Sequence, residues 1–300
     1  MTVRQRQGLG LALGAVVAFS FSLPWTVWAL ESFAPVLTAT GRAAIAGVIA
    51  LVILIVRRVP RPTRAQVRPL LYTMAGAVFG WPILIALALE RTTSAHAAVI
   101  AAVMPLVTAI IAVLRTRENV ATQFWIAAAC GTGALVVFAL LRGGAEGGDF
   151  VADILIAGAV IASSWCYVEG ATLTKQLPGW QVISWVVVLA LPITLPASFI
   201  IAGLGGVALP VTSQAWIGLI LLGVVSMYFA FFAWYQGLSM AGVARGAQMQ
   251  QLQAPLTLLW SALLLGEVIT WPIIIATLAV VASVTWAVRV RTPTVAAPEE

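Results

Sequence analysis

The chain has 300 residues, of which 62% are hydrophobic and only 9% are charged, and its mean hydropathy is +1.04. A soluble domain carries about 25% charged residues, so this chain has too few charges to coat a water-soluble globule, and lipid must be its solvent. Its net charge of +6 gathers at the ends of apolar segments, which indicates membrane topology rather than nucleic-acid binding.

Ten apolar stretches are long enough to cross a bilayer as helices, for which about 20 residues are needed. They lie at residues 8–29, 35–56, 68–90, 93–114, 122–141, 152–174, 180–202, 213–236, 239–263 and 269–289. The start MTVRQRQ resembles a signal peptide, but the many later stretches favour an uncleaved first helix. Residues 292–300 are expected to be a disordered tail. The sequence therefore predicts an all-α integral membrane protein with ten transmembrane helices.

Basic residues divide unevenly between the two sides of this predicted bundle. With the N-terminus in the cytoplasm, the outer helix ends hold only Arg91 and Arg142. The inner helix ends hold Arg4, Arg6, Arg57, Arg58, Arg61, Arg64, Arg68, Arg115, Arg117, Lys175, Arg289 and Arg291. Because positive residues concentrate on the cytoplasmic side of membrane proteins, both termini are predicted to be cytoplasmic.

The two halves of the chain echo each other at an offset of about 147 residues, as internal repeats of transporters do. GAVVAFS in the first half parallels GAVIASS in the second. A proline precedes a glutamate at similar spacing in each half, Pro105 before Glu118 and Pro255 before Glu267. Chance similarity between apolar helices is the alternative explanation.

This repeat divides the predicted helices into two units of five, residues 1–145 and residues 146–291. An odd number of helices in each unit forces the second unit to insert upside down. Inverted repeats of this kind place a substrate site near the middle of the membrane and alternate its access by rocking one part against the other.

Several stretches together carry a resemblance to a known family: TSAHAAVIAAVMP at 93–105, TATGRAAIAG around Arg42, and LLLGE at 263–267. With two five-helix halves that each end in P-x(11–12)-E, the chain resembles the drug/metabolite transporter superfamily, EamA type, over residues 8–289. Within it the chain is most similar to amino-acid exporters, in particular the YddG-type exporters of aromatic amino acids. It departs from the pattern at Arg117, where a glycine usually precedes the glutamate. The resemblance implies a bacterial inner-membrane exporter whose central cavity is built from both halves.

Four glutamines lie close together in the ninth apolar stretch, where unpaired polar groups are costly. At about 100° per residue, Gln248 and Gln251 share one side of a helix, and Gln250 and Gln253 share the nearly opposite side. We expect one pair to line a hydrated cavity and favour Gln248 and Gln251, because Arg245 on their side needs water or a partner. The alternative is that all four glutamines join helices together.

Prolines interrupt two helices at matching positions of the halves. Pro255 removes a backbone donor and frees the carbonyl of Gln251, as Pro105 does for Ala101. Proline-interrupted helices at corresponding positions indicate a transport site, so both prolines are candidates for substrate binding.

Few ionisable residues lie within the apolar stretches. Glu169 and Arg245 lie at similar depth, about 9 Å from the cytoplasmic side, and we expect them to pair across an inner gate; independent snorkelling is the alternative. Arg42 is expected to have a structural or gating role rather than to contact substrate. Its expected partners are the outer carboxylates Glu31, Glu90 and Glu267. His96, the only histidine, and Glu169 are the candidates for proton-linked transport.

Hydroxyl and aromatic residues complete the candidate substrate site. They are Ser20, Ser22, Trp81, Ser163, Ser164, Trp165 and Tyr228. A lining of aromatics, hydroxyls and amides suits a zwitterion or a neutral metabolite, whereas a multiply charged phosphate would demand several Lys or Arg. Simple packing is the alternative for each aromatic residue.

These features predict an exporter of amino acids or similar small metabolites that works downhill by alternating access. A pump for drugs or organic cations is the alternative, although such pumps usually hold a deep carboxylate. An intramembrane enzyme is disfavoured: the aspartates lie at one outer connection, no G-x-S-x-G motif is present, and metal ligands are too few. Cys130 and Cys166 are expected to be buried free thiols. We expect a monomer in the lipid bilayer, with no cofactor, metal or nucleic-acid partner.

Overall fold

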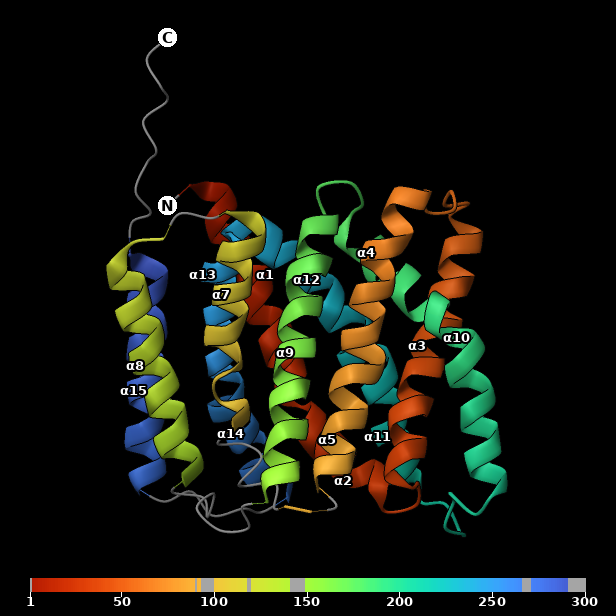
Figure 1. The fold of residues 1–300 in the computed structure, drawn as a ribbon. Helices are drawn as coiled ribbons and strands as arrows, with labels where there is room; N and C mark the ends of the chain where they lie inside the picture. Colours follow the sequence, from red (N-terminus) through yellow and green to blue (C-terminus); the bar gives the residue numbers. More distant parts are fainter. Residues whose placement is uncertain are drawn as a thin grey trace.

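The structure is a computed structural model, and it describes residues 2–89, 91–92, 100–117, 120–140, 149–265 and 271–290. These residues form helices that stand side by side in one bundle (Figure 1). The helices are α1 (Val3–Ser20), α2 (Ser22–Leu30), α3 (Pro35–Val56), α4 (Arg64–Met74), η1 (Ala75–Gly80), α5 (Trp81–Leu89), α7 (Met104–Thr116), α8 (Thr122–Ala139), α9 (Phe150–Leu173), α10 (Gly179–Gly203), α11 (Ser213–Leu221), η3 (Leu222–Phe229), α12 (Ala230–Ala241), α13 (Val243–Ala247), η4 (Gln248–Leu252), α14 (Gln253–Leu265) and α15 (Trp271–Arg289). β structure in the described ranges is limited to an isolated bridge between Phe33 and Val207, so the predicted all-α class is confirmed.

Each predicted apolar stretch contains helix in the structure. Among the described residues, five helical segments are long and apolar enough to cross a membrane: Val3–Leu30, Pro35–Val56, Phe150–Leu173, Gly179–Gly203 and Ser213–Ala241. Shorter apolar helices lie at Met104–Thr116, Thr122–Val137 and Thr277–Arg289. The total of ten spans stays a prediction.

Short polar side chains fix where some helices begin. At the start of α1, the Thr2 side chain accepts from the backbone N–H of Gln5, whose side chain accepts from the N–H of Thr2. Asp149 accepts from the N–H of Ala152 at the start of α9. These bonds satisfy donors that have no partner within a helix, so the sequence itself defines these helix starts.

Several helical segments change from α-helix to another kind of helix, or break, partway along. α1 and α2 meet at Phe21, and α13 leads into the 3₁₀-helix η4 before α14 begins. The π-helix η1 lies between α4 and α5, and the π-helix η3 lies between α11 and α12. The two π-helices occupy corresponding places in the two halves of the chain. Irregular helix of this kind is frequent at functional sites.

A helix of one half packs against the other half in the same way as the corresponding helix of the other half does. α1 packs against α12 as α4 and α5 pack against α9, and α1 packs on η4 as α9 packs on α7. α3 packs on α10, and α8 packs on α15. α1 begins at the upper end of the bundle in Figure 1, whereas α9 begins at the lower end. The first helices of the two halves therefore run in opposite directions.

Glycines permit close contact between α1 and α12. A Cβ added at Gly8 would meet Met240 and Ala241 at 2.6 Å, and one added at Gly237 would meet the backbone of Ala12 at 2.6 Å. Because lipid supplies no hydrophobic force between helices, close backbone approach is what stabilises such pairs.

Two local expectations are wrong. Residues 239–263 were predicted to form one helix, but Gly242, with φ 90° and ψ 131°, separates α12 from α13; glycine adopts this conformation without steric cost. Cys130 was expected to be buried, and it is exposed on α8. Cys166 is buried as expected, and both thiols are free.

Candidate substrate site

The break between α1 and α2 is built by a proline and repaired by another helix. Pro24 has no N–H, so the carbonyl of Ser20, four residues earlier, loses its helical donor. Thr257 of α14 supplies a replacement, because its Oγ1 donates to the Ser20 carbonyl at 3.0 Å. Trp260 Nε1 donates to Ser20 Oγ at 2.8 Å. Ser20 is fully buried, so this predicted site residue holds α14 in place.

Three aromatic rings stack at the break. The ring of Phe21 lies parallel to Trp25, with centroids 5.2 Å apart, and parallel to Trp260, with centroids 4.3 Å apart; each interplanar angle is 15°. Phe21 lies between α1 and α2, Trp260 lies within α14, and both stay partly exposed. The stacked rings offer a flat apolar surface at the break.

Arg42 lies about 10 Å along α3 from the first residue of that helix. Its Nη2 donates to Ser226 Oγ of η3 at 3.0 Å, and Ser226 Oγ lies 2.7 Å from Ser22 Oγ of α2. We call these three side chains the Arg42 cluster. Arg42 is partly exposed, but its Nε is sealed from solvent and has no hydrogen-bond partner in the described structure.

The partners predicted for Arg42 were outer carboxylates, and the structure does not pair it with Glu31. Glu31 accepts a hydrogen bond from Thr212 Oγ1 at 3.0 Å, while the described partner of Arg42 is the neutral Ser226. The other two predicted partners, Glu90 and Glu267, lie outside the described residues. The guanidinium is thus held by an uncharged hydroxyl within a predicted membrane span.

Gln248 and Gln251 were expected to line a cavity, and this expectation is wrong in the structure. In the 3₁₀-helix η4, residues three apart lie directly above one another, and Gln251 Nε2 donates to Gln248 Oε1 at 2.6 Å. Gln248 Nε2 donates to the carbonyl of Pro105 at 3.2 Å. The two side chains are 0% and 1% exposed. They join η4 to the start of α7 instead of facing water.

The other glutamine pair faces a different part of the interior. Gln250 Nε2 donates to the hydroxyl of Tyr167 on α9 at 3.2 Å, while Gln250 Oε1 is buried without a partner in the described residues. Gln253 stays partly exposed. Gln250 therefore joins η4 to α9.

Both predicted prolines lie at helix junctions. Pro105 is the second residue of α7, and Pro255 is the third residue of α14, directly after η4. Gln248 connects these two junctions through the Pro105 carbonyl. The prolines thus set the helix breaks, and the Pro105 carbonyl is occupied by a protein donor.

The predicted serines of α9 pack between helices. Ser164 Oγ accepts from Thr108 Oγ1 of α7 at 3.0 Å and is fully buried, and Ser163 is 4% exposed. Tyr228 is also buried, and its hydroxyl lies 2.7 Å from Ser184 Oγ of α10. Ser164 and Tyr228 therefore join neighbouring helices. Ser22 is the predicted serine that remains partly exposed.

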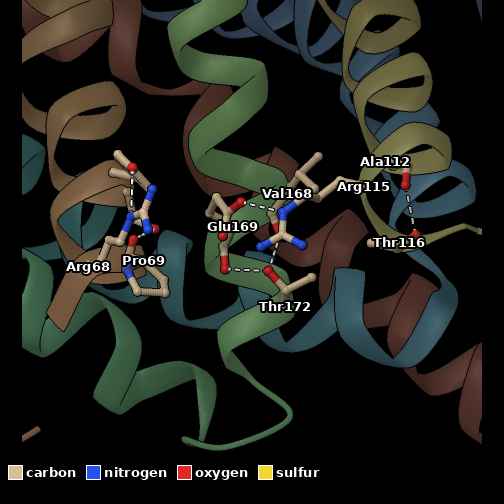
Figure 2. Close-up of polar contacts among 10 residues, drawn as sticks. Arg68, Pro69, Ala112, Arg115, Thr116, Val168, Glu169 and Thr172 are labelled. Atoms are coloured by element: carbon tan, nitrogen blue, oxygen red, sulfur yellow. Dashed lines mark hydrogen bonds and ion pairs between the residues drawn. The ribbon is translucent and has the colours of Figure 1, made fainter. Parts of the chain in front are cut away.

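Trp165 and Glu169 belong to a second site, toward the C-terminal end of α9. A cavity of about 570 Å³ is lined there by Ala65, Arg68, Pro69, Tyr72, Arg115, Trp165 and Glu169. Arg115 Nε donates to Glu169 Oε1 at 2.7 Å; Glu169 is 3% exposed, while Arg115 is half exposed. Figure 2 shows Arg115 reaching across to Glu169, with Arg68 on the opposite side of the carboxylate. The pair joins α7 to α9.

The predicted pair of Glu169 with Arg245 is replaced by this contact. Arg245 Nη2 donates to the carbonyl of Val290 beyond α15, at 2.9 Å. Arg245 is buried, so it fastens α13 to the end of the chain's last described helix. Among the remaining candidates, Trp81 is half-buried at the start of α5, and His96 lies outside the described residues.

Sequence reasoning missed Phe21, Trp25, Ser226, Trp260 and Arg115 as residues of these sites. Arg115 was counted only in the basic cluster at the inner helix ends. Phe21 had a usable signal, because Pro24 marks a helix break next to it. Ser226 is a lone hydroxyl in an apolar stretch, and only the packing of η3 on α3 reveals its role.

This combination defines a class of protein. Interrupted helices from two halves of the chain meet around polar side chains inside a membrane bundle, as they do in secondary transporters. The EamA-like transporter family model matches the chain twice, over residues 6–140 and 150–289. The chain belongs to the EamA-like transporter family, so the family resemblance is confirmed, and it is a multi-pass membrane protein.

Two known proteins are similar to the chain over most of its length. The uncharacterized transporter YdeK of Bacillus subtilis (strain 168) is 38% identical over 274 residues, which are 91% of this chain and 94% of YdeK. A protein of known crystal structure superposes with a TM-score of 0.78 over 94% of this chain and 98% of its own, at 18% identity. The second likeness shows the fold alone.

Proposed function

We propose that the protein exports amino acids, aromatic or neutral ones foremost, or similar small metabolites across a bacterial inner membrane. Transport proceeds by alternating access between two inverted five-helix halves, with both termini in the cytoplasm. The opposite directions of α1 and α9 and the paired helix contacts support this arrangement.

The observation that carries the proposal is the partly exposed surface at the α1–α2 break. Phe21 and Trp260 present flat rings. Ser22, the next residue after Phe21, is linked to Arg42 through the Ser226 hydroxyl and brings hydrogen-bond donors to the same break. An aromatic amino acid combines the same two features, a flat ring and a charged polar end. A charge inside a membrane bundle marks a functional position by default, and the neutral partner of Arg42 leaves room for a charged ligand.

The Arg115–Glu169 pair supports a gating role at the predicted cytoplasmic end. It connects α7 of the first half to α9 of the second. While it is formed, the two halves are held together on that side; when it opens, substrate enters between them from the cytoplasm. Substrate then rests at the α1–α2 break and leaves when the outer side opens.

Efflux of drugs or organic cations is the less supported function. A cation site needs a carboxylate that is free to bind it, and Glu169 is engaged by Arg115. Arg42 places positive charge in the interior site, where it would repel a cation. Both observations favour a substrate that carries negative charge at one end.

Flux through purified protein in lipid vesicles tests the proposal. Labelled phenylalanine and other labelled amino acids are followed while unlabelled amino acids or quaternary ammonium compounds compete. We expect saturable flux that amino acids inhibit. Transport inhibited only by quaternary ammonium compounds would favour the cation pump instead.

A pH gradient tests whether export is downhill. In the same vesicles, a pH gradient is imposed without a substrate gradient. Since the described interior holds few titratable groups, we expect no accumulation of substrate above its external concentration. Concentrative uptake would show proton coupling, for which Glu169 and His96 are the first residues to substitute.

A further inference from the structure

The Arg42 cluster holds a charge that its protein surroundings do not balance. Within the part of the chain that the structure describes, Arg42 pairs with no carboxylate; Ser226 Oγ is its acceptor. A charge in a low-dielectric interior is costly unless it is paired and hydrogen-bonded. Its Nε–H, sealed and without an acceptor, adds to this cost. Such a group is stabilised by a ligand that brings negative charge.

The hydroxyls of the cluster leave a further donor unused. Ser22 and Ser226 have one hydroxyl proton each, and one of these protons lies between the two oxygens. Whichever of the two hydroxyls donates, the proton of the other has no acceptor among the described residues. Arg42 is partly exposed, and its Nη1, unlike Nε, is not sealed and makes no hydrogen bond to a described residue. The cluster therefore offers unused donors on Nη1 and on a hydroxyl.

We propose that the Arg42 cluster binds the carboxylate of the substrate, and that transport requires a free carboxylate. A carboxylate accepts from two donors at once, and its hydrogen bonds to a guanidinium are among the strongest in proteins. The ring stack of Phe21, Trp25 and Trp260 lies beside Ser22 and receives an apolar or aromatic side chain. This inference rests on the proposed export of amino acids and names the part of the substrate that the site selects.

Competition between analogues tests the proposal in vesicles that contain the full chain. Phenylalanine, phenylalaninamide and phenethylamine share one ring, but only the first has a carboxylate. We expect the amide and the amine to inhibit labelled phenylalanine flux at least tenfold less well than the acid. Arg42→Gln should abolish this discrimination, and Arg42→Lys, which keeps the charge but not the fork of donors, should retain part of it.

Two further variants keep the test decisive if Arg42→Gln does not fold. Ser22→Ala and Ser226→Ala remove hydroxyl donors while leaving the guanidinium, and each should narrow the difference between acid and amide. Arg61→Gln, an exposed arginine in the connection before α4, is the matched control and should leave the difference unchanged. Elution of each variant as a single species in size-exclusion chromatography verifies folding.

The outcomes separate this inference from the proposed function. If amino acids are transported but the amide competes as well as the acid, or if Arg42→Gln keeps the full discrimination, the carboxylate proposal is overturned and amino-acid export stands. If no amino acid is transported and quaternary ammonium compounds are, both proposals fail together.

Discussion

Single polar residues repair the backbone where this chain breaks its helices. Pro24 deprives the Ser20 carbonyl of its helical donor, and Thr257 of α14 replaces that donor. Gln248 donates to the Pro105 carbonyl at another helix junction. The bilayer core holds no water that could donate to a free carbonyl. Each such side chain therefore stabilises a specific helix contact while it permits an irregular backbone near the site.

Substituting Thr257 tests this repair. Thr257→Val keeps the shape of the side chain but leaves the Ser20 carbonyl without its donor, so we expect it to lower stability by about 1 kcal/mol. Thr40→Val is the matched control, because Thr40 bonds only to carbonyls of its own helix. Thermal unfolding in detergent measures both, and equal effects of the two changes would contradict the repair.

The Arg115–Glu169 pair supplies a second prediction at this scale. Arg115→Gln leaves a buried carboxylate unpaired, which costs more than removing the carboxylate itself. We therefore expect Arg115→Gln to destabilise the protein by about 1–3 kcal/mol. This loss is smaller than for a fully buried pair, because Arg115 is half exposed and solvent screens its charge. Adding Glu169→Gln should recover part of the loss, as thermal unfolding of the single and double variants would show. Strictly additive effects would mean that the two residues do not interact.

Whole elements depend on close backbone contact. α1 and α12 cross where Gly8 faces Met240 and Ala241, whereas Gly10, one half-turn away on α1, has open space around it. The two glycines have the same helix propensity but different surroundings, which makes them a matched pair. The contact explains why α1 can run straight along α12 before it breaks at Phe21.

Alanine substitutions at these two glycines should have opposite effects on the stability of the protein. Gly10→Ala adds a better helix former and is expected to be neutral or to stabilise by up to about 1 kcal/mol. Gly8→Ala introduces a methyl group 2.6 Å from α12, so the two helices must separate. We expect this to lower the stability of the protein by about 1–3 kcal/mol, as overpacking a core does. Melting temperatures of the two variants decide this; a Gly8→Ala protein as stable as the Gly10→Ala protein would be incompatible with the contact.

Much of the fold followed from hydrophobicity and proline positions, while the site did not. The apolar stretches marked where helices lie, and the paired prolines marked where helices break. The choice between the glutamine pairs failed because it rested on a need of Arg245 for water, whereas Arg245 donates to the Val290 carbonyl. Gln248 and Gln251 instead bond to each other in the 3₁₀-helix η4. The partner of Glu169 is 54 residues away in the chain, and only helix packing selects Arg115 over Arg245.

At the scale of the whole molecule, the arrangement predicts which ends share a face. With both termini cytoplasmic, Val3→Cys should react with a membrane-impermeant thiol reagent only after cells are opened. Leu204→Cys, exposed after α10, should react in intact cells. Both substitutions are made in a chain with Cys130→Ser and Cys166→Ala. Labelling of Val3→Cys in intact cells would reverse the proposed orientation.

Accessibility of Ser22 tests the alternating-access account most directly. Ser22→Cys, in the same cysteine-free chain, places a thiol at the α1–α2 break between the ring stack and Arg42. In vesicles of known orientation, we expect impermeant thiol reagents to modify it from either face, with amino acids slowing the reaction and quaternary ammonium compounds not doing so. A thiol that reacts from neither face, or from one face only whatever the substrate, would contradict a chamber that opens alternately to the two sides.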